Sequence, residues 1–207
     1  VDNTSPRAEI TRPENNQIVS GKLEVIGSAQ DDYFQYYLVE GAVGLNPSSR
    51  DWETIAAENP KAVTDSDLCR LDTTEQADGI YSLRLIVKDQ VNRVSSVQRV
   101  IIIDNQPPKV ELKSPVENQK VTKIVDIIGT ASDANLKEYR ISIMAEEQQK
   151  EDDWKPIESG EESKTEVLLA KWNTLQVIDG PYRIRLVAVD KSGQPSIETT
   201  RRVTVDN

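Results

Sequence analysis

The stretch that decides the fold covers residues 179–190 and reads DGPYRIRLVAVD. Apolar and basic side chains alternate along it: Ile184 and Leu186 fall on one side of an extended chain, and Arg183 and Arg185 fall on the other. Because successive side chains of a β-strand point to opposite faces, this alternation predicts a strand with one buried and one solvent-facing side. The Asp-Gly pair in front of it is typical of a turn.

The same pattern occurs earlier in the chain. Residues 78–89 read DGIYSLRLIVKD, and further upstream the two copies match at an offset of 102 residues. The matched pairs include Pro13 and Pro115, Gly27 and Gly129, Tyr37 and Tyr139, and Trp52 and Trp154. We therefore expect two tandem domains, 1–103 and 104–207. Each copy closes on Asp-Asn after an apolar residue, so we expect two units of a longer protein.

Each copy contains short segments rich in β-branched and aromatic residues, separated by turn residues. About seven of them fit into roughly 100 residues, which is the pattern of a sandwich. In the first copy they are 8–11, 23–29, 33–39, 52–56, 68–72, 81–89 and 97–103. The predicted fold class is all-β: two tandem immunoglobulin-like antiparallel β-sandwiches of about seven strands each.

The second copy also carries motifs of a known kind of repeat. Trp172-Asn173-Thr174 is followed by Asp-Gly-Pro-Tyr at 179–182 and by the strand that ends at Asp190. This run resembles bacterial immunoglobulin-like and fibronectin type III-like surface repeats, which typically show Trp-Asp-Thr, Asp-Gly-x-Tyr and a terminal Val-Asp-Asn before prolines. The resemblance covers both copies, although Leu71 replaces the tryptophan in the first. It implies a module of the kind appended to penicillin-binding proteins and other bacterial cell-surface proteins.

The composition argues against catalysis. The chain has no His and one Cys, which removes the commonest general base, the commonest transition-metal ligand and any intrachain disulfide. We expect Cys69 to be a small buried residue. The carboxylates between Glu146 and Asp153 lie in polar sequence with no apolar neighbours to raise a pKa, so we interpret them as a solvated hairpin and not as a glycosidase pair. The prediction is that the protein is not an enzyme and has no catalytic or cofactor-binding residues.

The net charge of −10 disfavours nucleic acid as a partner. No apolar run reaches the roughly 20 residues that span a bilayer, so direct membrane insertion is not expected. The expected partners are a protein or cell-wall or surface carbohydrate, together with other domains of the parent chain. The resemblance implies an extracytoplasmic location in bacteria: cell surface, cell wall or secreted.

Two functions remain open on these grounds. The first is a non-catalytic spacer or interaction segment of a larger surface protein, which docks a partner or positions a domain. The alternative is a carbohydrate- or cell-wall-binding module, for which Trp52 and Trp154 could provide stacking platforms. We expect these two indoles, and Trp172, to belong to the sandwich cores instead. Tyr81 and Tyr182 occupy the place of a tyrosine corner, whose hydroxyl bonds main chain across the turn.

A possible calcium site follows from strand direction. In an up-and-down immunoglobulin-like topology, the second and the penultimate strands end at the pole where the chain comes in. In the second repeat Asp133 and Asp190 follow these strands and Asp104 lies on the incoming segment; Asp31, Asp89 and Asp2 are their counterparts in the first. Carboxylate oxygens are ligands for hard cations. The alternative is that these Asp residues accept hydrogen bonds from loop N–H groups.

Overall fold

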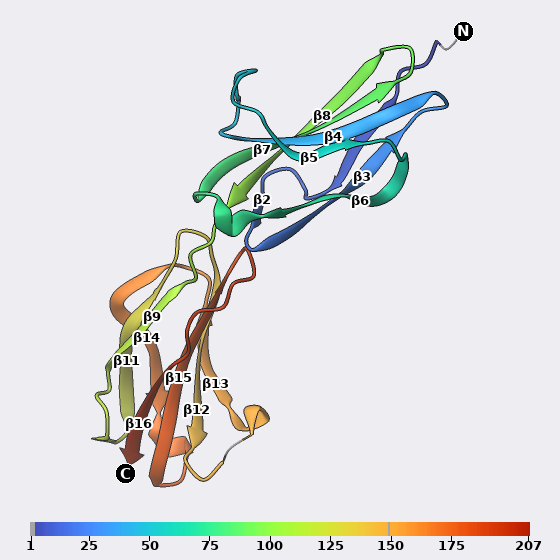
Figure 1. The fold of residues 1–207 in the computed structure, drawn as a ribbon. Helices are drawn as coiled ribbons and strands as arrows, with labels where there is room; N and C mark the ends of the chain where they lie inside the picture. Colours follow the sequence, from blue (N-terminus) through green and yellow to red (C-terminus); the bar gives the residue numbers. More distant parts are fainter. Residues whose placement is uncertain (1–2, 149) are drawn as a thin grey trace. The chain divides into compact units, whose positions relative to one another are not determined.

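The computed structural model describes residues 3–148 and 150–207. The chain forms two compact units, Val1–Asn105 and Gln106–Asn207, and Figure 1 shows each as two layers of strands. The strands of the first unit are β1 (Arg7–Arg12), β2 (Gln17–Val19), β3 (Lys22–Gln30), β4 (Phe34–Val43), β5 (Glu53–Asn59), β6 (Val63–Asp72), β7 (Gly79–Asp89) and β8 (Val94–Ile103).

The second unit repeats this order of elements. Its strands are β9 (Lys109–Ser114), β10 (Gln119–Val121), β11 (Ile124–Ser132), β12 (Leu136–Ala145), β13 (Lys155–Gly160), β14 (Lys164–Asn173), β15 (Gly180–Asp190) and β16 (Thr199–Val205). Short 3-10 turns follow β6 and β14, η1 (Thr73–Glu75) and η3 (Thr174–Gln176), and η2 (Glu151–Asp153) precedes β13.

Each unit consists of a three-stranded and a five-stranded sheet. In the first unit the orders are β1-β3-β6 and β2-β8-β7-β4-β5; in the second they are β9-β11-β14 and β10-β16-β15-β12-β13. The pairs are antiparallel, except that β2 and β10 run parallel to β8 and β16. The predicted fold class is confirmed. The described part of each unit has eight strands, one more than the predicted number of about seven. The additional strands, β2 and β10, have three residues each, too few to show a periodicity, and they join the larger sheet.

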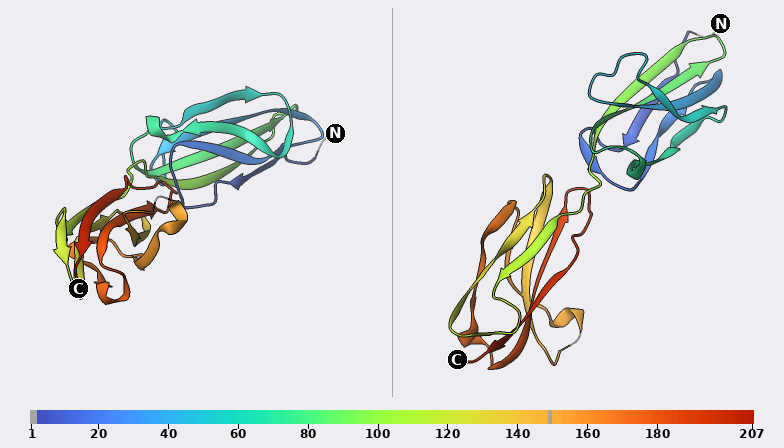
Figure 2. Two further views of the ribbon diagram at one scale, coloured as in Figure 1. Left: turned by 90° about the horizontal axis from the view of Figure 1, so that it is seen from below. Right: turned by 60° about the vertical axis from the view of Figure 1, so that its left-hand side comes forward.

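The expectation of a plain up-and-down topology is wrong. β3 pairs with β6, whereas β4 pairs with β7 in the other sheet, so the chain changes sheets between consecutive strands (Figure 2). The prediction about the poles does not depend on this difference. The two strands that precede Asp133 and Asp190, β11 and β15, still end at the same pole of the sandwich, because Asp190 stands opposite Leu136 at the start of β12.

The core of each unit forms between its two sheets as the alternation predicts. In β15, Ile184, Leu186 and Ala188 are buried, whereas Arg183 and Arg185 lie on the outer face. Trp172 is 3% exposed and packs edge-on against Tyr182, with ring centroids 5.6 Å apart. Its prediction as a core residue is confirmed. Burial of such residues supplies most of the stabilisation of each sandwich.

The prediction that Trp52 and Trp154 lie in the sheet interiors is wrong. Both indoles are only half-buried and belong to neither core cluster. Each lies just before an edge strand, on the outer face of the larger sheet, under an arginine: the Arg84 guanidinium is 4.1 Å from the Trp52 ring centroid, and that of Arg185 is 4.3 Å from the Trp154 centroid. Cation–π contact with the outward arginines holds them there.

The prediction that Tyr81 and Tyr182 form tyrosine corners is also wrong. Among the described residues, no hydrogen bond joins the hydroxyl of Tyr81 or Tyr182 to main chain. The hydroxyl that connects the two sheets of the first unit belongs to Tyr37, which donates to the carbonyl oxygen of Leu68 at 3.3 Å and accepts from Asn59 Nδ2 at 3.0 Å. Tyr37 lies in the core, and burial of its ring puts the hydroxyl within reach of the facing sheet.

Candidate metal centre

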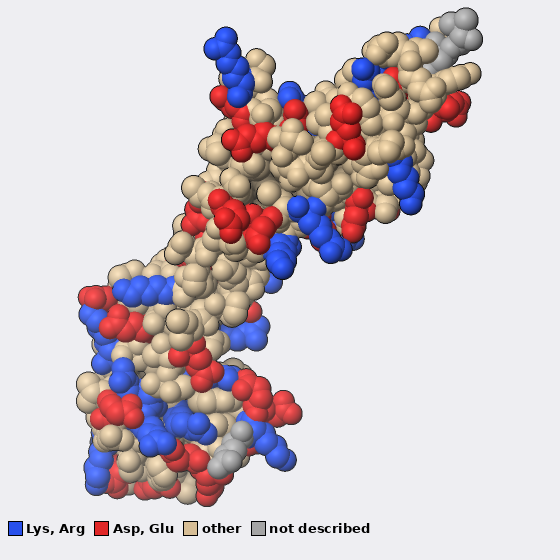
Figure 3. Space-filling model, viewed as in Figure 1, with Lys and Arg blue, Asp and Glu red and all other residues tan. Residues whose placement is uncertain are grey.

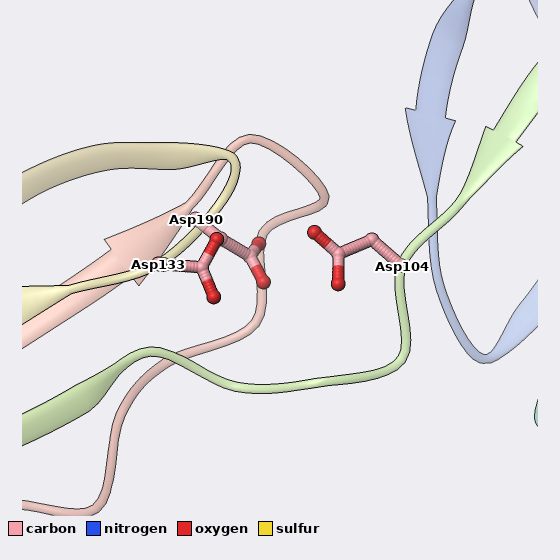
Figure 4. A group of neighbouring side chains, drawn as sticks. All are labelled: Asp104, Asp133 and Asp190. Atoms are coloured by element: carbon pink, nitrogen blue, oxygen red, sulfur yellow. The ribbon is translucent and has the colours of Figure 1, made fainter. Parts of the chain in front are cut away.

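Two of the predicted ligands of the second repeat follow directly from the ends of strands. β11 ends one residue before Asp133, and β15 ends at Asp190. Asp104 lies on the segment that leads into β9. One carboxylate oxygen of Asp133 lies within 4.8 Å of one of Asp190 (Figure 4). Asp133 and Asp190 thus lie at the ends of strands of the second unit, whereas Asp104 belongs to the first; their role as metal ligands stays a prediction.

The carboxylates at the strand ends also organise their loops. Asp133 Oδ1 accepts a hydrogen bond from the Asn135 N–H at 2.6 Å. Asp190 Oδ1 accepts from the Gln194 N–H at 2.9 Å and from the Ser192 hydroxyl at 2.6 Å. The turn-chemistry alternative therefore describes one oxygen of each of these residues. It leaves the second oxygen of Asp190 unexplained.

Asp190 is the residue with the most unusual surroundings. It is fully buried, with 0% exposure, and its Oδ2 has no hydrogen-bond partner among the described residues. Figure 4 shows its carboxylate next to that of Asp133, which belongs to the same unit. Ionised carboxylates about 5 Å apart repel one another by on the order of 3 kcal/mol per pair at an effective dielectric constant near 20. This arrangement is costly unless a positive charge compensates for it.

The first repeat has part of the same arrangement. Asp31 Oδ1 accepts from the Tyr33 N–H at 2.7 Å, and Asp89 Oδ1 accepts from the Val91 and Arg93 N–H groups at 2.9 and 2.8 Å. Asp89 is fully buried with an unpartnered Oδ2, like Asp190. Asp2, the third predicted ligand, lies outside the described residues. Asp31 and Asp89 are not part of any three-carboxylate group among the residues that the structure describes.

At the opposite pole, an asparagine fastens the outgoing chain to its own sandwich, a feature that the sequence reasoning missed. Asn105 Oδ1 accepts from the Thr73 hydroxyl at 2.9 Å, its Nδ2 donates to the Thr73 carbonyl oxygen at 2.8 Å, and its N–H donates to Asp78 Oδ1 at 2.8 Å. Asn207 makes the equivalent bonds to Thr174 and Asp179. The repetition of Asp-Asn at the end of both copies was the available signal.

Carboxylates of the acidic segment between Glu146 and Asp153 form ion pairs with arginines of the second unit. Glu151 pairs with Arg185 at 2.6 Å and Glu146 with Arg202 at 2.9 Å. Basic and acidic side chains are interleaved on the face of this unit that Figure 3 shows. Carboxylates that pair with arginines on the outer face of a sheet do not form the enclosed acid and nucleophile pair that glycoside cleavage needs.

Cys69 lies on β6 and packs against the first core. Burial raises the pKa of its thiol to about 12, so almost no thiolate forms near neutral pH. Because the thiolate is the reactive form, this cysteine has the properties of a packing residue and not of a nucleophile.

Comparison with known proteins places the fold. Neither a protein-family model nor a curated protein sequence matches the chain. Among solved structures, it is similar to the fibronectin(III)-like modules of CbhA from Clostridium thermocellum, with 17% identity over 96% of this chain and 93% of that chain and a TM-score of 0.51.

Two further structures are similar at lower scores. The FN1-FN3 domains of chicken CNTN1 match with 14% identity over 98% of this chain and 67% of that chain, at a TM-score of 0.48. A 1.5-MDa bacterial ice-binding adhesin matches with 13% identity over 100% of this chain and 67% of that chain, at 0.40. The fold is that of tandem fibronectin(III)-like and immunoglobulin-like modules. No helix among the described residues is long and apolar enough to cross a membrane.

Proposed function

We propose that this chain is a non-catalytic spacer and interaction segment of a larger bacterial protein of the cell surface or cell wall. The observation that carries the proposal is the asparagine that closes each repeat. Asn105 and Asn207 fix the point at which the chain leaves its sandwich through the same set of bonds to a 3-10 turn. A repeated, hydrogen-bonded exit suits a protein built from domains in series, since it defines where the next segment starts.

Two other features support this function. Each unit has its own core, so each is a complete building block. The outer faces of the larger sheets carry arginine, glutamate and tryptophan side chains that satisfy one another, as Arg84 does with Glu40 and Trp52. Faces of this kind provide polar surface for docking a protein while keeping the repeats soluble.

A replacement experiment in the parent protein tests the proposal. Residues 1–207 are exchanged for an unrelated tandem sandwich of the same length, and the surface display and activity of the remaining domains are measured. If the segment acts only as a spacer, both surface display and the activity of the remaining domains should be retained. If it docks a partner, display should be retained and partner binding should be lost. Loss of a chemical activity that the isolated 207-residue chain itself supplies would contradict the proposal.

The carbohydrate-binding alternative is tested separately. The isolated chain is sedimented with purified cell-wall polysaccharide, and Trp52→Ala and Trp154→Ala are compared with it. Because an arginine already covers one face of each indole, we expect no saturable binding. Saturable binding that both substitutions abolish would replace the spacer function with the carbohydrate-binding one.

A further inference from the structure

We propose that β5 of the first unit is an open sheet edge that binds an extended, basic peptide segment of a partner protein as an additional strand. The inference deepens the interaction role proposed above and rests on it only for the existence of a partner. Three observations support it: the unpaired side of β5, the residue that differs at the matching position of the second repeat, and the charge of the strand.

The outer side of β5 has main-chain groups that another strand can use. β5 is the last strand of the larger sheet and, among the described residues, it is paired with β4 alone (Figure 1). An edge strand presents a row of main-chain N–H and C=O groups, which is a template for a further extended segment. Because β5 has seven residues, a peptide that pairs along it gains several ladder hydrogen bonds, the main source of affinity in strand addition.

The second repeat blocks the same edge with a proline. Thr54 stands opposite Glu40 of β4, and Pro156 of β13 stands opposite Ser142, the residue that corresponds to Glu40. A proline has no N–H for the ladder, so within a sheet it occupies an edge strand with its nitrogen facing away from the neighbouring strand. Since the two pairs have the same register, the main-chain N–H of Thr54 points away from β4. The edge of β13 is closed to an added strand, and that of β5 is open.

The charge of β5 determines which peptide fits. The strand contains Glu53 and Glu58 and no basic residue, whereas β13 contains one residue of each sign, Lys155 and Glu158. Both glutamates of β5 are exposed, and neither is paired with a basic side chain among the described residues. Opposite charges on neighbouring strands stabilise a sheet, and like charges destabilise it. Lysine or arginine in the added strand would therefore strengthen its binding.

The same charges disfavour a second copy of this chain as the occupant. Two β5 strands paired edge to edge would bring Glu53 and Glu58 of one copy close to those of the other. The net charge of −10 adds a general repulsion between copies. A basic strand of another protein is attracted by the charges that repel a second copy.

Binding of a fluorescent peptide to the 207-residue chain tests the site. The probe is an acetylated and amidated peptide of the length of β5, in which lysine alternates with threonine; glutamate replaces lysine in its charge control. We expect the lysine peptide to bind saturably with a Kd on the order of 10–100 μM, because a short flexible peptide loses conformational freedom when it becomes a strand. The glutamate peptide should bind at least about tenfold more weakly. Bound lysine peptide should also slow hydrogen exchange in β5.

One substitution closes the edge in the first repeat as the second repeat does. Thr54→Pro should stay folded, because Pro156 occupies the corresponding position of the second unit. Its affinity for the lysine peptide should fall at least about tenfold, because the ladder loses a donor and the ring obstructs the added strand. Thr54→Ala is the matched control, since it keeps the main-chain N–H and should bind like the original chain.

The converse substitutions should open the second edge. Lys155→Glu combined with Pro156→Thr gives β13 the main-chain donor and the acidic character of β5. A second peptide should then bind to each chain, and hydrogen exchange should slow in β13 as well as in β5. A double variant that binds no further peptide would show that proline and charge do not control access to these edges.

Three other results would overturn the proposal. The first is the absence of saturable binding of the lysine peptide up to about 1 mM, a concentration well above the expected Kd. The second is a folded Thr54→Pro variant that binds the peptide like the original chain. The third is dimerisation in sedimentation experiments that Thr54→Pro abolishes, which would assign the edge to a second copy. If circular dichroism shows that Thr54→Pro unfolds, the double variant of β13 decides. None of these results affects the spacer role, which the domain exchange tests separately.

Discussion

At the scale of single residues, the asparagine that ends each repeat stabilises the turn next to it through several hydrogen bonds. Asn105 makes three hydrogen bonds: its side-chain amide accepts from the Thr73 hydroxyl and donates to the Thr73 carbonyl oxygen, and its main-chain N–H donates to Asp78. The two bonds to Thr73 satisfy the hydroxyl and the carbonyl oxygen of a fully buried residue at the start of η1. Removing one partner of a buried hydrogen bond leaves the other unsatisfied, which costs about 1–3 kcal/mol.

Replacement of Asn105 by Ala should therefore destabilise the first repeat by about 1–3 kcal/mol and loosen the turn after β6. Hydrogen exchange measured by mass spectrometry should show faster exchange around Thr73–Glu75. Asn207→Ala is the matched variant, because it removes the same bonds from the second repeat. Each variant should affect only its own repeat; unchanged exchange in both would show that the asparagines contribute nothing to the turns.

The three tryptophans should differ in their cost of removal. Trp172 is 3% exposed in the core, so Trp172→Ala should destabilise the protein by about 3–5 kcal/mol. Trp154→Ala removes a half-buried ring whose cation–π contact is worth about 0.5–1 kcal/mol at such a site, and it should cost much less. Urea unfolding gives both values. Equal costs would place Trp154 in the core after all.

Alkylation should reveal the state of Cys69. Burial disfavours the charged thiolate and raises the pKa of this thiol to about 12, so iodoacetamide at pH 8 should label the native chain far more slowly than the urea-unfolded chain. The sign of the linkage follows: the unfolded thiol ionises from about pH 8.5 and the folded one does not, so stability should fall as pH rises from there toward 12. A Cys69→Ala variant that loses the same stability over this range would show that other groups cause it.

At the scale of strands, close approach between neighbouring backbones requires glycine in β3 and β11. A Cβ added to Gly27 would lie 1.9 Å from the Glu9 carbonyl oxygen, and one added to Gly129 would lie 2.2 Å from that of Glu111. Each glycine lies next to a position at which the register of the strand pair shifts, in β1 with β3 and in β9 with β11. Glycine inside a strand often marks such an approach.

Gly27→Ala should consequently push β1 away from β3 and destabilise the first repeat by about 1–3 kcal/mol or more. Thermal unfolding of the full chain gives the size of the effect, and Gly129→Ala should reproduce it in the second repeat. Gly44 has open space around its Cβ position but a φ of +97°, so Gly44→Ala separates backbone strain from steric clash. A neutral Gly27→Ala variant would mean that β1 can shift at no cost.

At the scale of the whole molecule, the described residues form two hydrophobic cores, one in each compact unit. Each core draws on both sheets of its own unit. A repeat expressed alone, 1–105 or 106–207, is therefore expected to fold, because it keeps its core residues and its closing asparagine.

Core variants check this independence. Trp172→Ala should lower the stability of the second repeat and leave hydrogen exchange of the first unchanged, and Leu71→Ala, at the corresponding position, should do the reverse. Distant sites without shared partners contribute additively to stability. A double variant whose loss departs from the sum by more than about 0.5 kcal/mol would show that the repeats are coupled.

The sequence by itself determined the number of repeats, the fold class and the residues that face the core in the central strands. The reason is that period-two alternation in β7 and β15 is set by the pleat and needs no knowledge of the partner strand. It also indicated that Asp133 and Asp190 lie at one pole of the second unit, because β11 and β15 run in the same direction whatever their order within the sheets.

Only the tertiary structure decided the features that depend on which sheet and edge a strand joins. Trp52 and Trp154 precede edge strands in which the sequence shows no clear alternation, so the pattern could not show which side they face. The outward arginines of β7 and β15, one strand further into the sheet, decided it. In the same way, the sequence could bring Asp190 to the pole but could not show that one of its oxygens is enclosed without a partner. That depends on every group packed around it, and such packing arises only when distant segments meet.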